Sequence, residues 1–161
     1  MTQPWAPALD DVARHIPRRT RDTMTPGSDA MLNTFTAATT PTDDQAQTVI
    51  DDAVTLVLSA AGDLPPTTHP KYPDIADAAR SAASWRAAAD IELAYPVRDA
   101  DVQVFAQLDN RAKDALAALI ELMAHTETGA VEAVPVWMSP DPPPWADLSP
   151  GSGIEAVSGS G

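Results

Sequence analysis

The longest stretch with helical spacing of apolar residues runs from Asp101 to His125 and holds no helix breaker. Its apolar positions recur at steps of three and four, so they share one stripe of a helix. They are Val102, Phe105, Leu108, Ala112, Leu116, Leu119, Ile120 and Met123. The opposite face is polar, at Gln103, Gln107, Asn110, Asp114 and Glu121. Because an apolar stripe needs cover, we expect an all-α protein, a small bundle of about four helices with this long helix at its centre.

Two further amphipathic patterns lie in the N-terminal half. One covers residues 5–16 and stops at Pro17, whose ring cannot continue a helix. The other opens with the capping box Thr42-Asp43-Asp44-Gln45, in which threonine and glutamine satisfy each other's backbone N–H groups. It ends at Gly62, a residue typical of helix C-termini. Its wide apolar face predicts packing against the 101–125 helix. Residues 33–39 favour an extended chain, but they do not predict a sheet.

A third helix is expected from about Asp74 to Tyr95, after a connector with four prolines. It is rich in alanine, whose small side chain lets neighbouring helices approach closely. The larger anchors along it are Ile75, Trp85, Ile91 and Leu93.

The last part of the chain loses helical periodicity and becomes rich in proline, then in glycine and serine. We therefore predict a helical domain over residues 1–126 and an extended tail over residues 127–161. Trp137 and Trp145 stand in this tail. Because a tail cannot bury tryptophan by itself, we expect both to bind a partner, as interface tryptophans often do.

The net charge of −13 is unevenly spread. Residues 22–70 hold seven Asp and residues 114–161 hold seven acids, and neither range has a Lys or Arg. An acidic body repels the phosphate backbone, which argues against a sequence-reading DNA binder. Residues 1–21, by contrast, hold four Arg against two Asp. Arg14, Arg18, Arg19 and Arg21 therefore predict a docking surface for an acidic partner, with a plain solvated patch as the alternative.

The sequence gives little support for catalysis or metal binding. It has no cysteine, which excludes disulfides, thiolate metal sites and a cysteine nucleophile. Glu121 and His125 have the spacing of two ligands, but a helix-end histidine favoured by the dipole explains them better. The paired aspartates near the start of the second helix are explained by capping and solvation. We expect no catalytic residue, no metal and no cofactor. The chain also has no long apolar run and no signal pattern, so we expect it neither in a membrane nor exported.

Several short motifs occur in a suggestive order. They are Trp5-Ala6-Pro7, Asp11-Val12-Ala13, Ile16-Pro17-Arg18-Arg19-Thr20, Phe35-Thr36, Thr40-Pro41-Thr42 and Gly62. Over residues 5–125 this order and spacing resembles the head-to-tail connector (adaptor) proteins of long-tailed bacteriophages, especially those that infect actinobacteria. The resemblance implies a helical bundle that assembles, usually as twelve copies, into a ring beneath the portal protein. Such a ring extends the DNA channel toward the stopper and the tail, and DNA passes it without sequence-specific binding.

The proline-rich tail departs from this family, in which a terminal helix or arm reaches the portal in some members. The resemblance therefore leaves open which element would contact the portal. The rival interpretation is a free-standing acidic helical interaction or regulatory protein of a bacterial cell. A small metal-dependent helical enzyme comes third.

Overall fold

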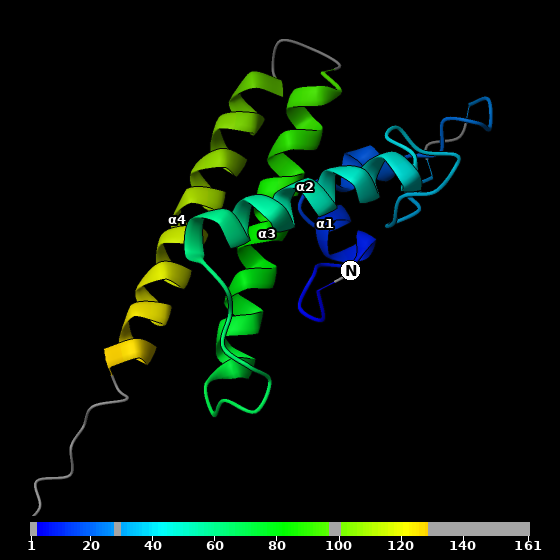
Figure 1. The fold of residues 1–161 in the computed structure, drawn as a ribbon. Coiled ribbons are helices and arrows are strands. Elements are labelled where there is room, and N and C mark those ends of the chain that lie inside the picture. The colour runs from blue at the N-terminus through cyan, green and yellow to red at the C-terminus, as the bar shows by residue number, and fades with distance from the viewer. Residues whose placement is uncertain (1–2, 28–29, 97–100, 129–161) are drawn as a thin grey trace, which may run out of the picture. The chain divides into compact units, whose positions relative to one another are not determined.

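Four α-helices and one 3-10 helix follow one another along the part of the chain that this computed structural model describes, residues 3–27, 30–96 and 101–128 (Figure 1). Side chains of the last helix are described from Gln103 to Thr126. The elements are α1 (Leu9–Ala13), η1 (Pro17–Thr20), α2 (Asp43–Ala61), α3 (Tyr72–Ala94) and α4 (Asp101–Thr128). Within these ranges the only β-type pairing is an isolated bridge between Arg21 and Met31. The prediction of an all-α helical bundle is confirmed.

The first helix is shorter than the expected 5–16. Proline disfavours helical dihedrals in the residue before it, so Pro7 keeps Ala6 out of a helix, and α1 begins at Leu9 after the extended residue Ala8. The Asp11 carboxylate then accepts the N–H of Ala8 at 3.0 Å, which fixes the first turn. Trp5 precedes the helix and is nevertheless only 2% exposed. It acts as an anchor of the N-terminal segment rather than as part of an amphipathic helix.

Helix α2 begins and ends where the sequence predicts. The backbone N–H of Thr42 donates to Gln45 Oε1 at 3.1 Å, and the Gln45 N–H donates to Thr42 Oγ1 at 3.4 Å, so the capping box is formed. At the other end Gly62 has a φ of 83° and its N–H donates to the Leu58 carbonyl at 2.9 Å. These local signals were readable because each joins residues only a few positions apart.

The centre of the bundle is α3, so the expectation that the long helix α4 lies there is wrong. α3 packs against α1, α2 and α4, whereas α2 makes its main contacts with α3 and fewer with α4. The described side chains that α4 buries are Leu108, Ala112 and Leu119. Others of its predicted stripe are half-buried, and Ile120 is 44% exposed. Alanine explains the difference, because its small side chain lets helices approach α3 from more than one side.

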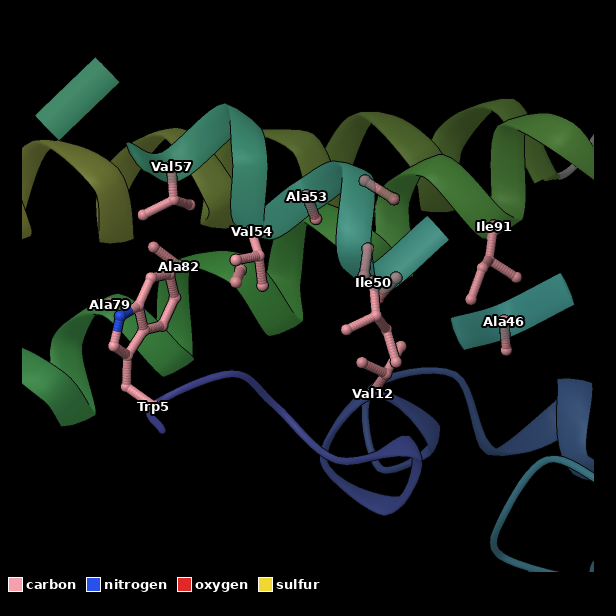
Figure 2. Packing of buried hydrophobic residues seen from close by; sticks show 14 of the residues in the cluster. Trp5, Val12, Ala46, Ile50, Ala53, Val54, Val57, Ala79, Ala82 and Ile91 are labelled. Atoms are coloured by element: carbon pink, nitrogen blue, oxygen red, sulfur yellow. The ribbon is translucent and has the colours of Figure 1, made fainter. Parts of the chain in front are cut away.

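Between α2 and α3 the core is built from small and branched side chains (Figure 2). Ala53 and Val57 point from α2 toward α3, Ile50 points toward Val12 of α1, and Trp5 points toward α3 from the N-terminal segment. Each is at most 2% exposed. None of the described helices carries an apolar run long enough to cross a membrane.

Candidate partner-binding surface

Two of the four N-terminal arginines bind the same carboxylate inside the chain. Glu92, on α3, is 1% exposed. Arg18 donates to it through Nε at 3.2 Å and through Nη2 at 2.7 Å, one bond to each oxygen. Arg19, itself 5% exposed, donates through Nη2 to Glu92 Oε2. η1 is thus held on α3 by a paired charge cluster.

The cluster sets the protonation state of Glu92. Burial by itself raises the pKa of a carboxyl group, because it penalises the charged form. The hydrogen bonds from Arg19 and Arg18, together with their positive charges, outweigh burial and hold the pKa of Glu92 below its ordinary value. The carboxylate is therefore ionised at neutral pH and can accept both guanidinium groups.

This arrangement divides the predicted docking surface. Arg19 faces the interior and is a structural residue, so it does not belong to the outer surface that we expected it to form. Arg18 keeps 44% of its side chain exposed while it binds Glu92. Arg21 is exposed, and its backbone takes part in the bridge to Met31. The sequence could not reveal this division, because the partner Glu92 lies on a different helix far along the chain.

Arg14 lies at the rim of a cleft between α1 and α3 of about 430 Å³. The cleft is lined by Asp11, Arg14, His15, Asp77, Arg80, Ser81 and Ser84. Arg14 is 73% exposed and pairs with Asp11 on its own helical turn. Across the cleft, Arg80 Nη1 lies 3.1 Å from Asp77 Oδ1, and its side chain is 41% exposed. Each arginine thus pairs with an aspartate three residues earlier, an exposed contact that contributes little stability.

An aromatic pair lies beside this cleft. The rings of His15 and Trp85 stack with centroids 3.6 Å apart and an interplanar angle of 27°. Burial lowers the pKa of His15, the nearby Arg14 lowers it further, and Asp11 opposes both. His15 is therefore neutral at pH 7 and packs as an aromatic ring. The sequence does not predict a site at either residue, because no sequence pattern links His15 to Trp85.

Several polar groups of the cleft are paired within the chain. The hydroxyl of Ser84 donates to the Arg80 carbonyl at 2.7 Å, so it is engaged in α3 itself.

Among the described residues, no three histidine, aspartate or glutamate side chains gather as metal ligands would. His125 Nε2 and Glu121 Oε1 lie 3.8 Å apart on an exposed turn of α4.

The other two predicted site residues, Trp137 and Trp145, lie outside the described residues, so their proposed contact with a partner stays a prediction. Of the predicted tail, residues 127 and 128 belong to α4 and residues 129–161 lie outside the described residues, so the tail as a separate region stays a prediction. Compared with known proteins, the chain matches no family model, no curated protein and no solved structure.

Proposed function

We propose that this chain is a structural protein of the neck of a long-tailed bacteriophage. In this role it forms a ring that joins the portal protein to the stopper and tail and extends the DNA channel. The observation that carries the proposal is the order and spacing of the motifs between Trp5 and Gly62, which resembles the head-to-tail connector proteins.

Several of the residues that carry this resemblance are buried or delimit a helix. Trp5, Val12, Ile16 and Phe35 are each at most 2% exposed. Arg19 is buried on Glu92, and Thr42 and Gly62 delimit α2. A resemblance that rests on such positions supports a shared architecture more strongly than one that rests on surface residues, which vary freely.

The charge of the outer surface is consistent with a wall past which DNA slides. Asp63, Asp74 and Asp114 are exposed outside α2, and none of them forms an ion pair within the described part of the chain. Unpaired carboxylates of one sign repel the phosphate backbone. An acidic neck subunit would therefore guide DNA without binding it.

The proposal is tested by locating the chain in particles. A phage that encodes this chain with an epitope tag should give purified virions labelled by a tag-specific antibody at the head–tail junction. A capsid protein carrying the same tag serves as the control and should label heads all round. Absence of the chain from purified virions would overturn the proposal and favour the acidic interaction protein of the host cell.

A further inference from the structure

The cleft between α1 and α3 faces away from α2. On α3 its lining residues Asp77, Arg80, Ser81 and Ser84 share one stripe. Ala79 and Ala82 lie on the opposite side of α3, where Ala82 meets Val57 of α2 (Figure 2). The cleft is therefore open on the side of α3 that α2 does not cover.

The acidic face of α2 points the other way. The buried residues of α2, among them Ala46, Ile50 and Ala53, pack toward α1 and α3. Asp44, Thr48 and Asp51 recur at steps of four and three on the opposite side, and all three are exposed. Asp52 lies beside them. Two surfaces that point in opposite directions cannot meet within one chain.

The arginines of the cleft can pair with the aspartates of α2, and Asp11 and Asp77 balance their charge within the chain. The cleft has two exposed guanidinium groups, Arg14 and Arg80. α2, in turn, lies within residues 22–70, where there are seven Asp and no Lys or Arg. The pairs that Arg14 and Arg80 make with Asp11 and Asp77 are exposed and weak, so carboxylates of a second copy can replace them. An Arg–carboxylate contact is also suited to bidentate hydrogen bonding.

We infer that the cleft between α1 and α3 of one copy binds the acidic outer face of α2 of the next copy. Because the two surfaces differ and point apart, the contact is head-to-tail, and repetition closes a ring when the rotation between copies allows it. The inference deepens the proposed function, on which the closed ring rests. The pairing itself can be measured on the purified chain alone.

Its test uses the absence of native cysteine. Three exposed positions each receive one cysteine in a separate variant: Ser81→Cys at the cleft, Thr48→Cys on the acidic face of α2 and Ala118→Cys on α4 as the control. Oxidation of a mixture of S81C and T48C should give a disulfide-linked dimer. The mixture of S81C and A118C should remain monomeric, as should each variant alone. No dimer from the first mixture, or equal dimer from the two mixtures, would overturn the inference.

Charge reversal provides a second test of the same contact. Arg14→Glu and Arg80→Glu, introduced into the S81C chain, should abolish the dimer with T48C. Asp51→Arg and Asp52→Arg, introduced into the T48C chain, should restore it with the reversed partner. Melting curves verify that each variant is folded, which is expected because all four positions are outside the core. A dimer yield that neither charge reversal changes would contradict a contact through these charges.

The two proposals fail separately. A specific S81C–T48C dimer from a chain that is missing from virions would overturn the neck function and leave the contact standing. A chain that is found in the neck but gives no S81C–T48C dimer would support the neck function and overturn the contact.

Discussion

Arg19 and Glu92 meet as a buried ion pair although 73 residues separate them in the sequence. Arg19 comes from η1 and Glu92 from α3, and the exposed fractions of their side chains are 5% and 0%. The pair therefore joins the N-terminal segment to the helix at the centre of the bundle. Some of the arginines that look like a binding patch in the sequence therefore make internal contacts of the fold instead.

Replacing Arg19 should destabilise the domain, whereas replacing Arg14 should not. Removing one partner of a buried ion pair typically costs about 3–5 kcal/mol, because it leaves the other charge without compensation. Arg18 also contacts Glu92, so we expect Arg19→Ser to lie near the lower end of that range. Arg14→Ser removes an exposed contact and should change stability by less than about 0.5 kcal/mol. Urea unfolding followed by circular dichroism measures both. Equal midpoints would show that the Arg19–Glu92 pair does not support the fold.

The same cluster predicts a loss of stability in acid. The pKa of Glu92 is lowered below its ordinary value of 4.5, because the hydrogen bonds and charges of Arg19 and Arg18 outweigh burial. A depressed folded-state pKa contributes stability that is present above pH 4.5 and is lost as pH falls through the folded-state pKa. The free energy of unfolding of the native chain should therefore fall below that pH, and Glu92→Gln should show a shallower fall.

Asp90, two residues earlier on α3, supplies a control of opposite sign. Burial raises the pKa of Asp90 above its ordinary value of 3.8, against the effect of Arg86. Its protonation therefore favours the folded state, and this contribution is lost as pH rises through the folded-state pKa. Asp90→Asn removes that gain and should make the acid loss steeper. Identical pH profiles for Glu92→Gln, Asp90→Asn and the native chain would contradict both assignments.

The sequence predicts the elements of this fold better than their arrangement. The capping box at Thr42 and the stop at Gly62 join residues a few positions apart, and both are formed. Which helix occupies the centre depends on how closely helices approach, and that distance is set by alanines that carry little hydrophobic signal. The longest amphipathic stripe therefore predicts α4 as the centre, although α3 occupies it.

Leu119 and Ile120 provide a direct test of the face that α4 buries. The exposed fraction of Leu119 is 0% and that of its neighbour Ile120 is 44%. A buried leucine replaced by alanine typically loses about 2–5 kcal/mol through lost burial and the cavity left behind. Leu119→Ala should reach that range, and Ile120→Ala should lose far less, as thermal unfolding can measure. Similar losses at both positions would mean that α4 is rotated about its axis.

Ala83 tests whether α3 is packed closely by its neighbours. It is fully buried, whereas Ala94 at the end of the same helix is exposed. Ala83→Leu should cost about 1–3 kcal/mol or more, because extra methylene groups force neighbouring helices apart. Ala94→Leu should be nearly neutral in the same denaturation experiment. Equal tolerance of leucine at both positions would contradict a close approach at Ala83.

The candidate site could be predicted only in part. Arg14 lies exposed on the cleft, and its docking to a partner stays a prediction. Arg19 does not lie on the cleft, because it binds the buried carboxylate of Glu92 on α3. The stacking of His15 on Trp85 and the cleft itself arise from the packing of α1 on α3, which local sequence patterns do not encode. A run of arginines predicts positive charge, whereas the fold decides which guanidinium groups face outward.

The most direct test of the proposed neck function is the product of a phage infection in which this chain is not made. Electron microscopy of the lysate should show DNA-filled heads separate from complete tails. Supplying the native chain from a plasmid should restore joined particles, whereas Leu119→Asp, which buries an unpaired carboxylate, should not. Joined, infectious particles at normal yield without the chain would contradict the account.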